Sequence, residues 1–373
     1  MSDGVPVAGI RQPDSETVTM SHAPPLPVAA HVVFAVWVLA LVLSSALVPG
    51  RYEAMLQEDR FIEWWTVPLF GAAGFFALRG AWRDRRVFDA LVGAFCIFVA
   101  GEEFSWGQRL LGFTPPAPFL EHNFQQELTL HNFADIFGQP KWVLVLALAG
   151  FGLLLPLVHR LPSGNRLLER IGATVPSATA APWFAVAIIL LVWYPLSFTG
   201  EWVEALAGGL FLAVLAPTPR RAAIAAAAGA VLAIALTAWS ARGNASAEEM
   251  ACARAEVEAL VEDLAYGTAA TLRLAGASAV HKRVFTSVRE GYIDAAGLAE
   301  YTAVSCQADA SAAERRRHIV DPWGTAYWVH VDRGADSIAV RVYSFGPNRR
   351  RDGTAATGAG DDIGVSVRLP TAF

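Results

Sequence analysis

Charged residues are scarce in this sequence, at 17% of 373 residues, whereas a typical soluble domain carries about a quarter. Lysine is almost absent, with 2 lysines against 27 arginines, a bias that suggests a bacterial chain from a GC-rich genome. The shortage of charge argues against a simple cytosolic enzyme. The net charge of −5, with arginines only in short clusters, argues against nucleic-acid binding.

Most apolar residues lie in long runs before residue 240. A helix needs about 20 apolar residues to cross the hydrocarbon core, and residues 28–48 reach this length without a charge. Six further runs are expected to span: 64–78, 87 to the early 100s, 142–158, 183–198, 202–215 and 222–239. The sequence therefore predicts a polytopic α-helical membrane bundle of about seven spans over residues 27–240. Residues 1–26 are expected to form a disordered cytoplasmic tail before an uncleaved anchor.

Arginines are concentrated in the loops after the second, fourth and sixth apolar runs. These are Arg79, Arg83, Arg85 and Arg86, then Arg160, Arg166 and Arg170, then Arg220 and Arg221. Because basic residues favour the cytoplasmic side, we expect a cytoplasmic N-terminus and a periplasmic domain over residues 241–373, in a bacterial inner membrane. In that oxidising compartment Cys252 and Cys306 can form a disulfide or remain packed thiols, and the sequence leaves both open.

The polar C-terminal part combines an amphipathic helix with alternating strands. Between residues 246 and 264, apolar side chains recur at steps of three and four, which predicts one apolar helix face. Residues 327–331 and 337–343, and the alternating pattern from 365 to 369, predict strands. The order predicts an α+β domain in which the helix packs on a small antiparallel sheet.

Three motifs of this part follow one another in a fixed order. They are Asp321-Pro322-Trp323-Gly324-Thr325-Ala326-Tyr327, then Tyr343-Ser344-Phe345-Gly346-Pro347-Asn348, then Asp361-Asp362-Ile363-Gly364. In order and spacing they resemble the C-terminal region of the type II secretion major pseudopilin. The resemblance covers residues 321–364 and implies a pseudopilin-like fold with a calcium site in the loop between the second and third motifs. It places Asn348, Asp361 and Asp362 at the ligand positions.

The chemistry of these side chains suits calcium, which takes about six to eight oxygen ligands. Asn348 replaces an aspartate of the family, and the arginines at 349–351 add positive charge to the loop, so we expect a lower affinity than in the family. Asp352 offers partial compensation. The alternative is a solvated, Asp-Gly-rich surface turn. Trp323 is expected in the core.

The assembly signal of pseudopilins is not matched. That family has a leader cleaved before a phenylalanine, followed by an apolar helix with glutamate at its fifth position. Here Gly112-Phe113 is followed by Pro115 and Pro116. We therefore expect the module to be displayed by the membrane bundle for recognition, and not to polymerise.

A polar segment begins where the third apolar run leaves the bilayer. Residues 101–109 read Gly-Glu-Glu-Phe-Ser-Trp-Gly-Gln-Arg, and Leu130-His131-Asn132 follows later. This combination also resembles a group of bacterial polytopic proteins of no assigned activity. A continuing helix would place Glu102, Trp106 and Arg109 on one face. Ionisable groups at membrane depth indicate a functional site by default.

Further carboxylates are expected at the same outer end. Glu63 starts the second predicted span, and Glu201 and Glu204 share a face at the start of the sixth. We therefore expect these side chains and the polar segment to converge on one pocket.

Three interpretations of this cluster remain open. His122, His131 and one of Glu102, Glu103 and Glu127 can hold zinc, although their spacing fits no zinc motif. A buried carboxylate can act as a general acid or base while Arg109 holds a phosphate. The same groups can form buried pairs in a structural cap. The sequence contains no G-x-S-x-G, Walker, dinucleotide-binding or H-E-x-x-H motif, which argues against the known enzyme classes.

The sequence favours an inner-membrane protein with a calcium-binding, pseudopilin-like periplasmic domain that acts in envelope recognition, assembly or secretion. Its expected partners are membrane lipids and envelope or secretion proteins. The alternative is a membrane-embedded enzyme acting on a lipid or lipid-linked substrate at the periplasmic leaflet. Its catalytic residues would be Glu102, Glu103, Arg109, His122 and His131. A transporter ranks last, because four of the predicted spans carry almost no polar residue.

Overall fold

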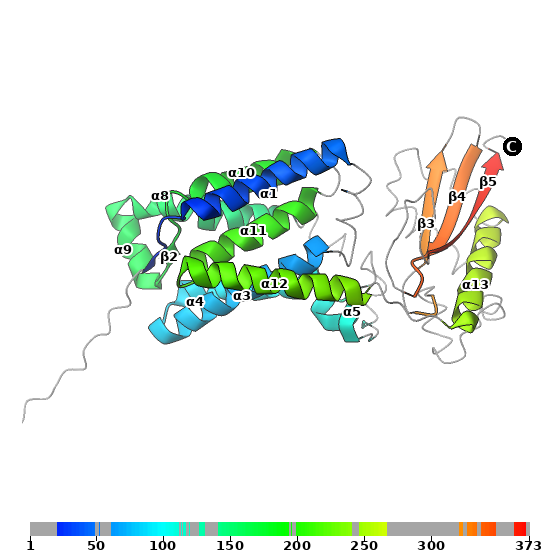
Figure 1. Ribbon diagram of the computed structural model, residues 1–373, viewed down its shortest axis with the longest axis horizontal. Coiled ribbons are helices and arrows are strands. Elements are labelled where there is room, and N and C mark those ends of the chain that lie inside the picture. Colours follow the sequence, from blue (N-terminus) through cyan, green and yellow to red (C-terminus); the bar gives the residue numbers. More distant parts are fainter. Residues whose placement is uncertain are drawn as a thin grey trace, which may run out of the picture.

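The computed structural model contains a helical bundle that ends at Ser240 and a module of one helix and one sheet that begins at Ala247 (Figure 1). The structure describes residues 21–48, 52, 61–111, 113, 115–116, 119, 127–130, 141–193, 195, 199–240, 246–266, 321–323, 327–333, 337–347 and 362–370.

Among the described residues, four helices are long and apolar enough to cross a membrane. They are α1 (Val28–Leu47), α3 (Phe61–Asp84), the continuous helix Lys141–His159 and α12 (Pro219–Ser240). Three shorter helices, α4 (Val87–Glu103), α10 (Ala181–Trp193) and α11 (Thr199–Leu215), complete the bundle, with α4 after α3 and the pair α10 and α11 before α12. Each of the seven predicted apolar runs therefore coincides with a helix over most of its length, and the run predicted over residues 183–198 is helical as far as Trp193.

Helix α11 forms the centre of the bundle. It contacts α1, α3, α10 and α12, and it buries Val203, Leu210 and Phe211 among other side chains. Helix α1 buries Phe34 and Leu41, while most of its other large apolar side chains are exposed. Long apolar surfaces of this kind suit contact with lipid tails, because in water they would mark an interaction site or an aggregation risk.

Glycines allow α3 and α4 to pack closely as an antiparallel pair. A Cβ atom at Gly74 would lie 2.8 Å from Cγ1 of Ile97, and one at Gly93 would lie 2.8 Å from Cγ of Leu78. Small residues are common where membrane helices cross, because the backbones can then approach one another. The pair places the C-terminal end of α4 beside the N-terminal end of α3.

The helix Lys141–His159 is irregular in its middle. Two α-helical parts, α7 (Lys141–Leu148) and α8 (Leu155–His159), flank the π-helical stretch η2 (Ala149–Leu154). Within η2, Gly152 faces α10, and a Cβ atom on it would lie 2.0 Å from Cγ of Phe184. The neighbouring Phe151 stacks on Phe211 of α11 with ring centroids 5.0 Å apart. The π-helical stretch thus fits the helix around the central aromatic side chains.

A short parallel sheet lies at the end of the bundle where α1 begins. Strand β1 (Ser21–His22) pairs with β2 (Thr174–Val175), which follows the amphipathic helix α9 (Pro162–Ile171). The tail predicted over residues 1–26 therefore differs from the structure in its last residues. Ala23 and Leu26 are buried, and this burial fixes the segment before α1.

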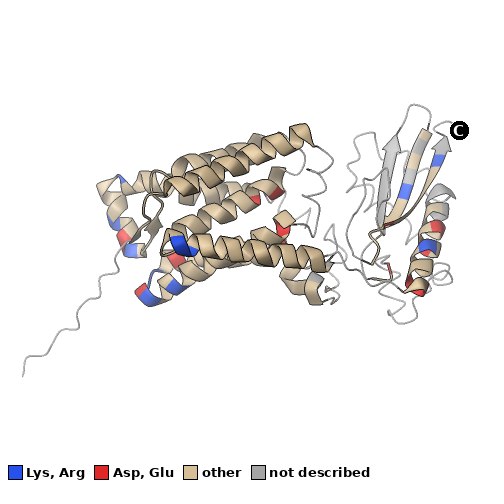
Figure 2. Ribbon diagram, in the orientation of Figure 1, with Lys and Arg blue, Asp and Glu red and all other residues tan. Residues whose placement is uncertain are grey.

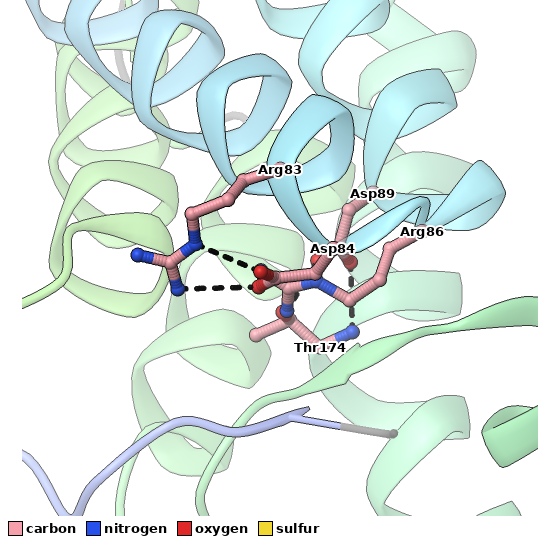
Figure 3. A network of polar contacts seen from close by, with 5 residues as sticks. All are labelled: Arg83, Asp84, Arg86, Asp89 and Thr174. Carbon is pink, nitrogen blue, oxygen red and sulfur yellow. Dashed lines mark hydrogen bonds and ion pairs between the residues drawn. The ribbon is translucent and has the colours of Figure 1, made fainter. Parts of the chain in front are cut away.

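A polar network around Asp89 joins the turn between α3 and α4 to β2 (Figure 3). The buried Asp89 carboxylate accepts hydrogen bonds from the backbone N–H and the hydroxyl of Thr174, both at 2.7 Å, and pairs with Nη1 of Arg86 at 2.9 Å. Arg86 also pairs with Asp84 at 3.2 Å. Gly172, at φ 64°, lies against this arginine, and a Cβ atom there would meet its Cα at 2.8 Å. Only glycine fits that position without strain.

The C-terminal module consists of helix α13 (Ala247–Tyr266) and a three-stranded antiparallel sheet. The sheet order is β3 (Trp328–Arg333), β4 (Ser337–Ser344) and β5 (Ile363–Pro370). Helix α13 packs against β4 and β5 and buries Ala253, Val257, Leu260 and Val261. The predicted helix, the predicted strands and their antiparallel order are confirmed.

The cysteines occupy different environments in the two parts. Cys96 is buried and free in α4, whereas Cys252 in α13 is disulfide-bonded. Cys306, the third cysteine of the sequence, lies outside the described residues. The sequence left the state of Cys252 open, and in the structure it forms a covalent cross-link.

Candidate functional site

The polar segment predicted to carry the site follows the end of α4. Glu103 is the last residue of that helix, and the short 3-10 turn η1 (Ser105–Gly107) and the one-turn helix α5 (Gln108–Leu111) come next. Ser105, Trp106 and Gly107 have φ values of 51°, 50° and 86°. These consecutive left-handed residues end α4, so the continuous helical face considered from the sequence does not form.

The left-handed conformation requires support from outside the backbone. It costs a residue with a Cβ atom about 1–3 kcal/mol, and such strain concentrates at functional positions. Part of the support comes from Gly101, on which the indole ring of Trp106 lies. A Cβ atom at position 101 would be 2.8 Å from three atoms of that ring.

Glu102 is buried, with 5% of its surface exposed, and both of its carboxylate oxygens accept hydrogen bonds. The indole Nε1 of Trp106 donates to Oε1 at 2.8 Å, and the backbone N–H of Leu130 donates to Oε2 at 2.6 Å. A carboxylate with two such donors is held in place. Glu102 therefore positions the segment around residue 130 against the end of α4.

Two further side chains of the polar segment bind the same stretch of chain. The hydroxyl of Ser105 donates to Oε2 of Glu127 at 2.8 Å, and the backbone N–H of Leu128 donates to Oε1 of Gln108 at 2.7 Å. Together with Glu102, these bonds attach residues 127–130 to η1. The motif thus uses most of its polar groups to build a rigid surface beside Glu103.

Three carboxylates converge at this end of the bundle. One oxygen each of Glu103, Glu201 and Glu204 lies within 4.8 Å of the others, and all three side chains are half-buried. We call them the acidic centre. Glu201 and Glu204 lie one turn apart at the start of α11, where the positive end of the helix dipole favours negative charge. The sequence predicted that Glu201 and Glu204 converge with the polar segment. This is confirmed, because Glu103 belongs to that segment. Glu63 is not one of the three.

The acidic centre is suited to a positively charged ligand. Like charges this close repel one another, so the oxygens need a shared proton or a positive charge nearby. Carboxylate oxygens alone favour hard cations such as calcium, magnesium or manganese over zinc, which prefers nitrogen and sulfur. The described acidic residues of the bundle lie mainly at its two ends, and most of its basic residues lie at the end opposite the acidic centre (Figure 2).

Three of the five predicted catalytic side chains cannot be compared with the acidic centre. His122 and His131 lie outside the described residues, as does the side chain of Arg109. A zinc site that combines these histidines with Glu102, Glu103 or Glu127 stays a prediction.

In the C-terminal module, the first two sequence motifs are joined by a buried network. The carboxylate of Asp321 accepts hydrogen bonds from the backbone N–H of Trp323 at 3.1 Å and from the hydroxyl of Ser344 at 2.6 Å. That hydroxyl in turn accepts one from the N–H of Gly346 at 2.9 Å. Asp321 and Ser344 are fully buried, so these motif residues stabilise the fold. Trp323 is buried as well, and its predicted place in the core is confirmed.

Only one of the three predicted calcium ligands lies among the described residues. Asp362 is half-buried and directly precedes β5, while Asn348 and Asp361 lie outside the described residues. The donor set of two carboxylates and one amide fits the oxygen preference of calcium.

Sequence reasoning did not anticipate most polar contacts of the described residues, and three examples show why. They are the contacts from Gln108 to Leu128, from Ser344 to Asp321 and from Tyr327 to Glu256, the last a hydrogen bond between two buried side chains. The only available signal was that these polar residues stand in or next to sequences otherwise rich in apolar and aromatic residues. Comparison with protein-family models, with curated proteins and with solved structures finds no match to this chain.

Proposed function

We propose that this chain is a bacterial inner-membrane protein that displays its C-terminal module in the periplasm for envelope recognition, assembly or secretion. In this proposal the seven helical segments of the bundle cross the membrane, and the N-terminus is cytoplasmic. The four membrane-length helices support the membrane location. The three shorter helices are apolar and pack in the same bundle, which supports a further span for each.

The distribution of charge supports this orientation. Arg83 and Arg86 at the turn between α3 and α4, Arg166 in α9 and Arg220 in α12 lie in segments at the end where α1 begins. Figure 2 shows that basic residues gather at this end. Because basic residues are retained on the cytoplasmic side, the opposite end, with the acidic centre, faces the periplasm. The chain leaves α12 at that opposite end and continues into the module.

The single observation that supports the recognition role is the tightly packed and cross-linked structure of the C-terminal module. Helix α13 packs on the sheet, the Asp321–Ser344 network joins two of its turns, and Cys252 adds a covalent cross-link. Disulfides persist in oxidising compartments such as the periplasm. A rigid, cross-linked domain on a membrane bundle suits binding to another envelope component. Asn348, Asp361 and Asp362 are proposed to hold a calcium ion that stabilises its last turn.

This proposal can be tested by photo-crosslinking in living cells. A photo-reactive amino acid at the exposed position Glu258 of α13 should form an adduct of discrete mass with an envelope protein. The same group at exposed Ala228 of α12 should react with lipid only. Asp321→Ala, which disconnects the two motif turns, should abolish the protein adduct while the full chain remains in the membrane. Identical adducts from both positions, or an adduct unaffected by Asp321→Ala, would contradict recognition by the module.

The acidic centre favours a second candidate function, a membrane enzyme acting on a lipid or lipid-linked substrate at the periplasmic leaflet. Here Glu103, with Glu201 and Glu204, would transfer protons or hold a cation, and Glu102 would position the loop. Arg109, His122 and His131 are the further proposed participants. Cells expressing Glu201→Gln should then accumulate a lipid that cells with the wild-type protein convert, as measured by mass spectrometry of lipid extracts. Glu258→Gln on α13 is the control, and equal lipid profiles for all three would exclude this function.

A further inference from the structure

A cavity of about 510 Å³ lies between α1, α3, α11 and α12, towards the end of the bundle where α1 and α12 begin. Its walls include Leu26, Phe34, Leu69, Leu206 and Ala222. The volume falls within the range of small-molecule sites, about 300–1,000 Å³. The cavity is separate from the acidic centre, and the inference drawn from it goes beyond the proposed function, requiring only that the bundle lies in a membrane.

The indole N–H groups of the two tryptophans that line the cavity are bonded within the protein. The indole N–H of Trp37 donates to the carbonyl oxygen of Trp202 at 3.0 Å, and that of Trp65 donates to the carbonyl oxygen of Ala226 at 3.1 Å. The remaining wall consists of apolar side chains and small residues such as Gly209. Water does not fill apolar cavities readily, whereas apolar ligands do. In a membrane the most abundant apolar group is an acyl chain.

Two arginines flank the cavity at the start of α12. Pro219 and Ala222 both line it, and Arg220 and Arg221 stand between them in sequence with exposed side chains. Within the part of the chain that the structure describes, neither arginine forms an ion pair. Thr218 caps this helix, since its hydroxyl accepts the N–H of Arg221 at 3.2 Å. The positive end of the α12 dipole adds to the two guanidinium charges.

We propose that this cavity binds a glycerophospholipid with an anionic head group. One acyl chain occupies the space between α1 and α12, and the phosphate is bound by Arg220 and Arg221. Guanidinium groups recognise phosphate through paired hydrogen bonds, and an adjacent apolar slot fixes the depth of the chain. The same arginines that orient the bundle thereby hold a lipid of that leaflet.

Native mass spectrometry of the full-length protein in detergent tests the head group. Phosphatidylglycerol should bind the wild-type protein more tightly than phosphatidylcholine. The double variant Arg220→Ser/Arg221→Ser should weaken phosphatidylglycerol binding roughly 25-fold, since each basic residue near an anionic lipid contributes about a factor of five. Arg160→Ser/Arg166→Ser removes two exposed arginines that have no cavity-lining residue beside them in sequence, and it should leave binding unchanged. Equal losses in both double variants, or no preference between the two lipids, would overturn the proposal.

A cavity-filling substitution tests the acyl chain. Ala222→Trp places a large ring in the cavity and should abolish retention of phosphatidylglycerol. Ala227→Trp, at an exposed position of the same helix, should not. Retention by both variants would overturn the site.

Photolabelling tests the site in the wild-type protein, so its result does not depend on whether a variant folds. Phosphatidylglycerol with a photo-reactive group in its acyl chain should label wild-type peptides that contain Phe34 and Leu206 of the cavity wall. Uniform labelling of exposed lipid-facing positions such as Val36 and Ile234, without enrichment at the cavity wall, would mean general solvation by lipid and would contradict the proposal.

Discussion

Carboxylates of the bundle differ in whether their charge is satisfied by nearby donors or lies beside other carboxylates. Asp89 binds both donors of Thr174 and the guanidinium of Arg86, and Glu102 binds one indole and one backbone N–H. Both are enclosed and satisfied, so they fix chain segments to helix ends. Glu103 follows Glu102 in sequence but lies close to Glu201 and Glu204, whose like charges repel its own. Of the two neighbouring residues, Glu102 thus has a structural role, while Glu103 belongs to the proposed site.

Asp89→Ala should strongly destabilise the bundle. The substitution leaves the guanidinium of Arg86 without its nearest partner in a site where its side chain is only 11% exposed. Breaking a buried pair by removing one partner costs about 3–5 kcal/mol. Asp84→Ala removes the more exposed partner of the same arginine and should cost at most about 1 kcal/mol, because solvent screens that pair. Unfolding of both variants in detergent should therefore give clearly different midpoints, and equal midpoints would show that the Asp89 network is dispensable.

At the level of residues, the sequence predicted which side chains lie at the same end of the bundle better than it predicted their individual contacts. Glu201 and Glu204 could be placed near the polar segment, because alternating spans bring those ends together. The conformation of Ser105 and Trp106 could not be predicted, since a left-handed turn without glycine at those two positions depends on contacts from residues 127–130. The pairing of Asp321 with Ser344 depends on tertiary structure in the same way.

Among the elements, the π-helical stretch η2 depends on the absence of a side chain at one position. Gly152→Ala should destabilise the bundle by a few kcal/mol, because the new Cβ atom would lie 2.0 Å from Cγ of Phe184 and overpacking must displace one of the two helices. Gly150→Ala lies in the same stretch, where a Cβ atom meets nothing within 4 Å, and should have a small effect. Thermal unfolding in detergent compares the two. A similar loss from both variants would indicate that backbone flexibility, not the contact with Phe184, is required.

A capping box begins helix α13. The backbone N–H of Glu249 donates to the hydroxyl of Ser246 at 3.1 Å, and the backbone N–H of Ser246 donates to Oε2 of Glu249 at 2.9 Å. Hydrogen bonds from the backbone and then from the hydroxyl of Ser246 hold the pKa of Glu249 below its ordinary value. The folded pKa is therefore lower than the unfolded one, about 4.3. The stabilisation is complete above the unfolded pKa and is lost as the pH falls through the folded pKa.

Ser246→Ala should therefore weaken α13 at neutral pH and matter less in acid. Loss of such a cap costs about 0.5–2 kcal/mol. The protection of α13 amides against hydrogen exchange, corrected for the intrinsic effect of pH and measured by mass spectrometry, should fall in the variant at neutral pH. The difference from wild type should shrink below about pH 4. Glu248→Gln, one residue away, is the control, and a loss of protection independent of pH would contradict the role of the Glu249 carboxylate.

The helices and strands were more predictable than the irregular elements. An apolar run in a membrane forms a helix because a helix makes all of its backbone hydrogen bonds within the segment. The alternation of apolar and polar residues predicted β4 and β5. The pair of β1 and β2 was not predicted, since each strand has two residues and their partners are far apart in sequence. Nor was η2, because its deviation from a regular helix is set by packing against α10.

At the scale of the whole molecule, charge and covalent chemistry both support the proposed orientation. The arginine-rich turns lie at one end of the bundle, and the acidic centre lies at the other. The disulfide-bonded Cys252 belongs to the module that follows α12. The orientation could be proposed from the sequence because it depends on the number of basic residues in each loop, which requires no knowledge of packing, and it stays a prediction.

Reporter fusions test this orientation directly. Alkaline phosphatase, which requires an oxidising compartment, should be active when fused after Phe373 and inactive when fused after Gly172, beside β2. A fluorescent protein that matures only in the cytoplasm should give the opposite pattern at the same two positions. In the full chain, Cys252 should resist alkylation until a reductant is added, because its sulfur is held in a disulfide. Phosphatase activity only after Gly172 would place the arginine-rich turns in the periplasm. It would contradict both the periplasmic location of the module and the periplasmic exposure of the acidic centre.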